Sequence, residues 1–416
     1  MRILVLDGNE NQAVASVRSL ARAGYHVSAG ADTRWSKAGW SRHCARSFTY
    51  PAPQEDAGAF VASIASEASR EPGTLVLPMT ERTTLPISRD RAAIAAAGGR
   101  LALPPHDVVM QAFDKEHTTA VARSLGIDVP RTITVSSAAD AKHHAATLRY
   151  PVVLKPRSSQ EYMAGGTVRT TGAPVYARNA DELLRGWSDL EQRCRSALVQ
   201  EFVDGAGVGY FALMRHGEVR AEFAHRRLRD VRPTGSGSSL RISTRPDPAV
   251  RQRALAILAA LNWHGIAMVE FRIRPDGTPV FLEVNGRFWN SLALAVYAGV
   301  DFPALVARLA IAGDVEPVTA YRAGVLCRWW LGDVRHLVEV WRGAPPGFPG
   351  RFPGRLRTLA SVVVPRRGTY HDNFMLGDPL PELGDWLHFI VHKVHPRTTS
   401  RVAAKVWHAK GRPSLP

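Results

Sequence analysis

The sequence predicts a mixed α/β and α+β protein of two or three domains, on three observations. The chain has 416 residues and 45% of them are hydrophobic, which is ordinary for a globular protein of this size. Over the first hundred residues, short apolar runs alternate with segments of helical spacing, the order of a parallel Rossmann-like layer. After Pro104, longer β-rich runs joined by tight turns replace that alternation, which is typical of antiparallel sheets.

Residues 1–104 are predicted to form the parallel layer. The run ILVLDG is the first strand, and the segment 12–23 has helical spacing and ends at Gly24. The strand YHVSAGA, a helix over 56–69 and the strand TLVLP continue the alternation. The turn DGNENQ after the first strand lacks the glycines that let a backbone approach a pyrophosphate, so a nicotinamide-dependent oxidoreductase is a remote alternative.

Residues 105–315 are predicted to form a second, mostly antiparallel domain. Two helices end at Phe113 and Gly126, and strands follow near 132–135 and at PVVLK, ALVQEFV and YFALMRHGEVRAEFAH. A helix over 248–261 precedes the strands AMVEFRIR and PVFLEVN, and the Asp276-Gly277 pair between them is a strong hairpin signal. Residues 316–416 form a basic C-terminal region to which the sequence assigns no role.

The net charge of +16 favours acidic partners such as nucleotides, anionic metabolites or lipid headgroups. From residue 317 onward there are fifteen Lys or Arg and six Asp or Glu, so this region carries a surplus of nine positive charges. No specific nucleic-acid partner is expected, because no recognised binding motif or aromatic-basic platform accompanies the charge. Three scattered cysteines, no secretory signal and no apolar stretch of spanning length predict a cytoplasmic protein.

The sharpest chemical feature is the predicted hairpin between Glu270 and Arg287. Glu283 and Asn285 share a face by the two-residue period of a strand, and the turn at Asp276 brings Glu270 opposite them. Two carboxylates and an amide oxygen are hard ligands that suit magnesium, and Arg287 on the same face can hold a carboxylate or phosphate. The competing interpretation is an edge hairpin whose solvated carboxylates pair with nearby arginines.

Two further segments carry candidate nucleotide contacts. Lys155 ends an apolar strand and precedes a loop with Ser158, Ser159, Gly165, Gly166 and Thr167, whose backbone donors can cradle polyphosphate although no Walker loop is present. The strand residues Gln200, Glu201, Phe202 and Val203 can offer backbone groups to an adenine edge and apolar side chains to its ring. Each segment taken alone is also compatible with an ordinary strand and a solvated lysine.

Together these features resemble the ATP-grasp superfamily, and more narrowly bacterial carboxylate-amine ligase-like proteins, over about residues 1 to 315. The carriers are DKEHTTAVARSLGIDVP, YPVVLKP with the loop to Gly166, LVQEFVDG, and above all GIAMVEFRIRPDGTPVFLEVNGRFWNS. The resemblance implies an ATP-grasp fold with an N-terminal Rossmann-like domain, called pre-ATP-grasp, and a C-terminal extension. It also implies ATP with Mg²⁺ or Mn²⁺ as cofactors, and frequent homodimers among similar ligases.

The resemblance assigns roles residue by residue. Glu270, Glu283 and Asn285 would bind the metal, Lys115 and Lys155 the ATP phosphates, and Gln200, Glu201, Phe202 and Val203 the adenine. The loop with Ser158, Ser159, Gly165 and Gly166 would close over the triphosphate, and Arg287 would stabilise the transferring phosphoryl group. Where many relatives carry a ribose-binding glutamate, this chain reads Ala206-Gly207-Val208-Gly209, which leaves Asp204 as a weak substitute.

The implied activity is ATP-dependent carboxylate-amine ligation. A carboxylate would become an acyl phosphate with release of ADP, and an amine would then displace phosphate. The stretch AHRRLRDVRPTGSGSSLRIST resembles the substrate-facing segment of such ligases, and within it Arg241 and Arg232 are the candidates for anchoring an anionic acceptor. The alternative is a non-catalytic ATP-binding adapter that docks through its basic C-terminal region.

The C-terminal region holds Trp329, Trp330, Trp341 and Trp407 among basic residues. Packing of this region against the rest of the protein is favoured over a weak contact with a membrane surface. The motif HDNFMLGDPLPELGDW near 371–386 is predicted to be ordered, without an assigned mechanism.

Overall fold

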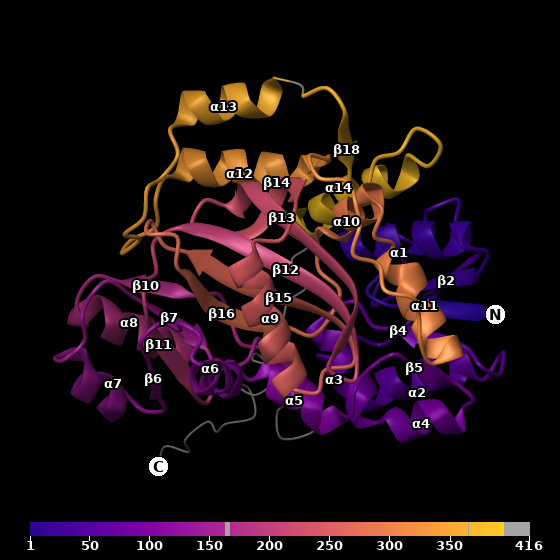
Figure 1. The fold of residues 1–416 in the computed structure, drawn as a ribbon, viewed down its shortest axis with the longest axis horizontal. Helices are drawn as coiled ribbons and strands as arrows, with labels where there is room; N and C mark the ends of the chain where they lie inside the picture. Colours follow the sequence, from indigo (N-terminus) through magenta and orange to yellow (C-terminus); the bar gives the residue numbers. More distant parts are fainter. Residues whose placement is uncertain (163–166, 365, 395–416) are drawn as a thin grey trace, which may run out of the picture.

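Four β-sheets organise the chain, which the computed structural model describes over residues 1–162, 167–364 and 366–394 (Figure 1). The N-terminal sheet is parallel, with the strand order β3-β2-β1-β4-β5. Its strands are β1 (Arg2–Val5), β2 (His26–Ala31), β3 (Arg46–Thr49), β4 (Leu75–Leu77) and β5 (Arg100–Leu101). Its helices are α1 (Asn11–Arg22), α2 (Ala57–Ala68), α3 (Glu81–Arg89) and α4 (Arg91–Ala96). Every residue of β1 and β4 is buried, as expected for the inner strands of a parallel sheet.

A second, four-stranded antiparallel sheet has the order β10-β7-β11-β6. The helices α5 (His106–Phe113) and α6 (Lys115–Ser124) precede β6 (Thr132–Val135), α7 (Ala138–Ala145) and β7 (Val152–Pro156). Next come β8 (Gln160–Tyr162), β9 (Val168–Thr170), β10 (Val175–Ala177), α8 (Ala180–Leu190) and β11 (Ala197–Glu201). The strands β8 and β9 form a small hairpin within the stretch that was predicted to be a loop over the triphosphate. Two of the glycines predicted to belong to that loop, Gly165 and Gly166, lie outside the described residues.

The largest sheet has seven strands in the order β16-β15-β12-β13-β14-β17-β18. They are β12 (Ala206–Arg215), β13 (Glu218–Arg232), β14 (Ser236–Thr244), β15 (Gly265–Ile273), β16 (Pro279–Asn285), β17 (Leu326–Arg328) and β18 (Thr369–His371). The turn from β12 to β13 uses His216 and Gly217, both with positive φ (45° and 83°), as a tight hairpin requires. Residues beyond 315 therefore extend the same sheet through β17 and β18.

Helices cover both this sheet and its junction with the N-terminal sheet. They are α9 (Pro248–Ala260), α10 (Leu292–Ala298), α11 (Phe302–Ala312), α12 (Trp330–Arg342), α13 (Arg355–Val363) and α14 (Leu380–Val394). Residues of β1 and α1 share one apolar core with β12, β13, α10 and α11. Taken singly, no helix in the described ranges is long and apolar enough to cross a membrane; α10 and α11, bent by 87°, pass the length and composition criteria as a pair.

The motif around residues 371–386 docks against α1 and the segment that follows β2. Arg18 Nε lies 2.8 Å from Asp378 Oδ2, and Lys37 Nζ lies 2.8 Å from Asp385 Oδ1, with all four side chains buried. Asn373 Nδ2 donates to Asn11 Oδ1 at 3.0 Å. Buried charges need such partners, so this segment is ordered by its contacts with residues more than three hundred positions earlier.

The same docked segment makes stability depend on pH. Burial raises the pKa of Glu382, in α14, to about 7, against the opposing effect of the indole N–H that Trp386 donates at 2.8 Å. The folded state therefore holds this proton between about pH 4.5 and 7 while the unfolded chain releases it. The free energy of unfolding is expected to fall by on the order of 1–3 kcal/mol across that window. Urea unfolding at pH 5 and pH 7.5 should show this loss of free energy in the wild type and not in Glu382→Gln. The same change in the free energy of unfolding in both proteins would contradict the prediction.

Candidate functional site

The hairpin β15–β16 brings the acidic residues together. Its turn is closed by Arg274 and Thr278, with Gly277 at φ 88° where a side chain would be strained. The register sets Glu270 opposite Glu283, with a bulge just after Glu270. Gly286 then lets the chain pass against Trp263, whose ring would lie 2.3 Å from any added Cβ.

Asn285 bridges the two carboxylates. Its Nδ2 lies 3.2 Å from Glu283 Oε1 and 3.5 Å from Glu270 Oε1. Its Oδ1 accepts a hydrogen bond of 2.9 Å from Arg287, whose Nε lies 3.7 Å from Glu81 Oε1 on α3. The structure thus gathers the predicted metal ligands and Arg287 at one point.

Two lysines face this cluster from separate elements. Lys155 lies on β7, where Val152 and Leu154 point into the core and the alternating positions point outward. Lys115 begins α6, whose N-terminus is capped by Asp114, and its Nζ lies 3.7 Å from Glu283 Oε2 and 3.2 Å from Ser159 Oγ. Two elements separated in the sequence, β7 and α6, therefore supply cations to the same carboxylate pair.

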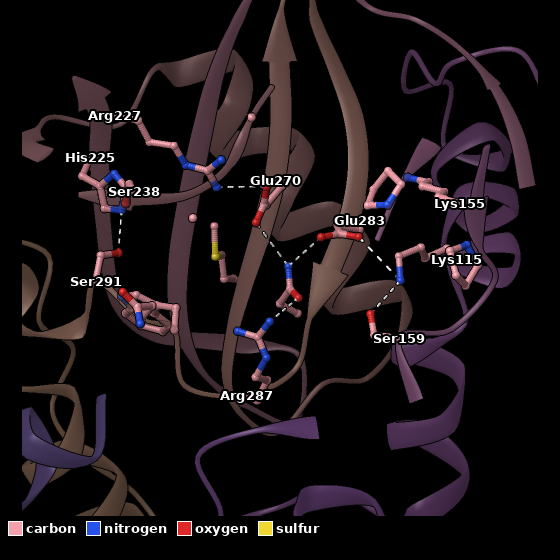
Figure 2. A pocket seen from close by; sticks show the side chains of 18 of the residues that line it. Lys115, Lys155, Ser159, His225, Arg227, Ser238, Glu270, Glu283, Arg287 and Ser291 are labelled. Atoms are coloured by element: carbon pink, nitrogen blue, oxygen red, sulfur yellow. Dashed lines mark hydrogen bonds and ion pairs between the residues drawn. The ribbon is translucent and has the colours of Figure 1, made fainter. Parts of the chain in front are cut away.

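These side chains line a cavity of about 340 Å³ between the seven-stranded sheet, β7 and α6. Figure 2 shows the acidic pair in its centre, with lysines on one side and basic and hydroxyl groups of the seven-stranded sheet on the other. The lining polar side chains are Lys115, Lys155, Ser159, His225, Arg227, Ser238, Glu270, Glu283, Asn285, Arg287, Asn290 and Ser291.

Charge in the cavity is balanced through specific contacts. Burial alone would raise the pKa of Glu283, but Lys115 and Lys155 outweigh it and hold that pKa well below its ordinary value. Burial lowers the pKa of Lys155 to about 8, against the opposing effect of Glu283. Arg227 pairs with Glu270 at 3.0 Å, and that carboxylate raises the pKa of the guanidinium. Each of the two carboxylates is therefore matched by a cation.

The donor set fits a divalent cation. The two carboxylates are hard ligands of the kind Mg²⁺ prefers, and the amide of Asn285, which here turns Nδ2 toward them, would offer its oxygen after rotation about its last side-chain bond. Within the described ranges, no three His, Cys, Asp or Glu side chains converge to hold a metal.

Some predicted nucleotide contacts lie outside the cavity lining. Ser158 Oγ donates to the carbonyl of Gln160 at 2.8 Å and lines a separate cavity beside α5 and α6. Gln200 is buried, with its Nε2 donating to Thr132 at 3.0 Å, and Glu201 lies 3.5 Å from Arg274. Phe202 packs edge-on against Tyr176 and Phe348, and Val203 is buried.

The structure does not bring Arg241, predicted as an acceptor anchor, to the cavity. Its side chain is fully buried, with NH2 2.5 and 2.6 Å from the two oxygens of Asp372 and NH1 donating to the Ser238 carbonyl at 2.9 Å. The partner Asp372 belongs to the docked C-terminal segment, so the guanidinium of Arg241 forms a structural ion pair with it. Arg232, the second candidate, is exposed at the end of β13 and is not part of the cavity lining.

The sequence analysis gave no individual role to several residues that line or support the cavity, among them Glu81, His225, Arg227 and Ser291. His225 Nε2 lies 2.8 Å from Ser291 Oγ, and burial holds the pKa of this imidazole well below its ordinary value, so it is neutral. The alternation of β13 aligns His225 and Arg227 toward the cavity, a signal that was present in the strand pattern.

No protein-family model matches the chain. Among curated proteins, it is 29% identical over 217 residues to the N-terminal section of the carbamoyl phosphate synthase large chain of Methanopyrus kandleri, a match covering 49% of this chain and 37% of that protein. It is 26% identical over 216 residues to the D-alanine–D-alanine ligase of Nitrosospira multiformis, covering 48% of this chain and 66% of the ligase. The matches thus span between 37 and 66% of the length of these two relatives.

Solved structures share the fold at lower identity. An L-amino acid ligase from Bacillus licheniformis superposes with a TM-score of 0.57 at 18% identity, over 76% of this chain and 74% of that one. A biotin carboxylase from Campylobacter jejuni, in a β,γ-ATP complex, gives a TM-score of 0.60 at 14% identity, over 78% of this chain and 74% of the other. At such identities the likeness establishes the fold.

Proposed function

We propose that the chain is an ADP-forming ligase of the ATP-grasp superfamily that joins a carboxylate to an amine. One observation carries the proposal. A pair of carboxylates, bridged by Asn285, shares a cavity with two lysines and Arg287. That arrangement suits a triphosphate and its metal, because it offers both the acidic groups that bind a divalent cation and the basic groups that bind phosphate oxygens.

The two lysines are the proposed phosphate contacts. Lys155 and Lys115 reach the acidic pair from β7 and α6, so a bound polyphosphate would lie between the two sheets. Adenine would lie farther along β11, against the backbone of 200–203, where the strand leaves the four-stranded sheet. The aromatic packing of Phe202 against Tyr176 and Phe348 stiffens that segment.

Glu270, Glu283 and Asn285 would hold the metal. When bound there, Mg²⁺ supplies neutralisation of phosphate charge and fixes the orientation of the triphosphate. Basic side chains of the chain balance the negative charge of the two carboxylates: Arg227 pairs with Glu270, and Lys115 pairs with Glu283. Each carboxylate therefore has a basic partner in the structure.

The chemistry has two displacements. A carboxylate oxygen of the substrate attacks the γ-phosphorus, the bond to the β-phosphate oxygen breaks, and ADP leaves. An amine nitrogen then attacks the acyl carbon and phosphate leaves, while the amine loses a proton. Arg287 is held by Asn285 and Glu81, and stabilises negative charge on the transferring group. The similarity to a D-alanine–D-alanine ligase and to an L-amino acid ligase supports small carboxylate and amine substrates.

Arg287→Lys is expected to lower kcat about a hundredfold while changing the dissociation constant of ATP by less than about threefold. A lysine keeps the positive charge, but its ammonium lacks the rigid, planar set of donors with which a guanidinium can contact Asn285 and a phosphoryl oxygen at the same time. Steady-state ADP release and equilibrium ATP binding would measure the two quantities. Arg215→Lys, at the end of β12 and outside the cavity lining, is the matched control. Equal losses in both variants would contradict the assignment.

The function itself is tested by ADP and phosphate release with Mg²⁺-ATP against pooled carboxylates and amines. Release that requires both an acid pool and an amine pool supports the ligase. Release that needs an acid but no amine would redirect the second step to another nucleophile. Tight ATP binding with no release from any pool would favour the adapter alternative.

A further inference from the structure

Helix α13 (Arg355–Val363) lies at the outer edge of the molecule, on the far side of α12 from the seven-stranded sheet (Figure 1). Its buried residues are Thr358 and Val362, one turn apart on the same side. These two side chains attach the helix to the protein, so the opposite side faces outward.

The outward side is the more apolar one. Leu356, Leu359 and Val363 have the spacing of a single helical stripe and are 81, 40 and 68% exposed, and Val364 after the helix is 60% exposed. A surface helix of a globular protein normally turns such a stripe toward the core. The apolar face of α13, which the spacing of its residues would predict to be buried in a core, is therefore exposed.

The surroundings of this stripe are strongly basic. The sequence from 340 to 371 contains no Asp or Glu, while Arg351, Arg355, Arg357, Arg366 and Arg367 all fall within it. Among the residues that the structure describes, none of these five arginines is in an ion pair, and all five are exposed. Arg355 and Arg357 lie on the two flanks of the apolar stripe, at about 100° steps around the helix.

From this combination we propose that α13 and its flanking arginines dock on an anionic lipid bilayer. The apolar stripe would enter the boundary between headgroups and acyl chains, and the arginines would contact lipid phosphates. A basic surface with an exposed apolar stripe matches that partner in both charge and polarity. None of the residues that line the cavity belongs to α13 or to these five arginines, so docking through α13 does not use the proposed active site.

The charge of the α13 surface argues against a second copy of the chain or its own C-terminal residues as the partner. A second copy would bring five arginines against five arginines. Residues 395–416 of the same chain add Arg397, Arg401, Lys405, Lys410 and Arg412 without an acidic residue, so they would be repelled as well. Nucleic acid matches the charge, but exposed Leu and Val side chains gain nothing on a phosphate backbone.

The test is sedimentation of the full chain with vesicles of phosphatidylcholine alone or with about one-third phosphatidylserine. We expect binding to the anionic vesicles and little to the neutral ones, with at least about a tenfold loss of affinity in the double variant Leu356→Glu, Val363→Glu. Leu125→Glu, at the C-terminal end of α6 and 43% exposed, is the matched control and should bind like the wild type. Thermal unfolding of all three proteins should coincide, since none of these side chains is buried.

Three outcomes would overturn the proposal. They are absence of binding to the anionic vesicles, binding that the double variant leaves unchanged, and equal loss in the Leu125→Glu control. A fourth outcome that would overturn the proposal is detected by light scattering. A concentration-dependent dimer that the double variant abolishes would show that this face is an interface between two copies of the chain.

Discussion

Glu283→Gln is expected to lower ADP formation by about a thousandfold or more, because several kcal/mol of charge stabilisation are lost at the metal and phosphate site. The side chain keeps its size and its hydrogen bond to Asn285, so the change removes charge and little else. Lys115, 3.7 Å from Glu283, would lose its acidic partner, and the site would hold a divalent cation less tightly. Acid-dependent ADP release at saturating ATP measures the effect.

The matched control is Glu218→Gln, which lies at the exposed start of β13 and outside the cavity lining. It should retain wild-type turnover. Turnover of Glu283→Gln within about threefold of the wild type would remove this carboxylate from the mechanism, since a metal ligand cannot be replaced at so small a cost.

Asp372→Ala is expected to lower the free energy of unfolding by about 3–5 kcal/mol. It leaves the fully buried guanidinium of Arg241 without the carboxylate that lies 2.5 and 2.6 Å from it. The cost arises from an uncompensated charge in a site that water does not reach. Urea unfolding gives the free energy directly.

The double variant Arg241→Met, Asp372→Leu removes both charges and should recover most of that loss, to within about 1–2 kcal/mol of the wild type. The pair also decides the role of Arg241. If this arginine contacted an acceptor, Asp372→Ala would leave stability unchanged, and Arg241→Met would raise KM for the acceptor without unfolding the protein.

Local signals in the sequence were sufficient for the acidic hairpin. The Asp276-Gly277 turn and the two-residue period of strands predict that Glu270, Glu283 and Asn285 meet, and the register of β15 with β16 brings them together. The same reasoning identified β1, α1, β2, α2, β7 and α9 close to their observed bounds. In these cases neighbouring residues in the sequence also determine the structure.

Long-range contacts could not be read in that way. Arg241 and Asp372 are separated by 131 residues, and nothing in either local pattern indicates that they pair. The short strands β17 and β18 join the largest sheet although they have only three residues each. The stripe of α13 illustrates a different limit: periodicity defines an apolar face, but the fold decides whether that face is covered.

The central claim is that this cavity converts a carboxylate into an acyl phosphate. Hydroxylamine intercepts such an intermediate, so the most direct measurement is hydroxamate formation with Mg²⁺-ATP and pooled carboxylic acids. We expect hydroxamate and ADP in equal amounts from the wild type and neither from Glu283→Gln. ATP binding with no hydroxamate and no ADP from any acid pool would contradict it.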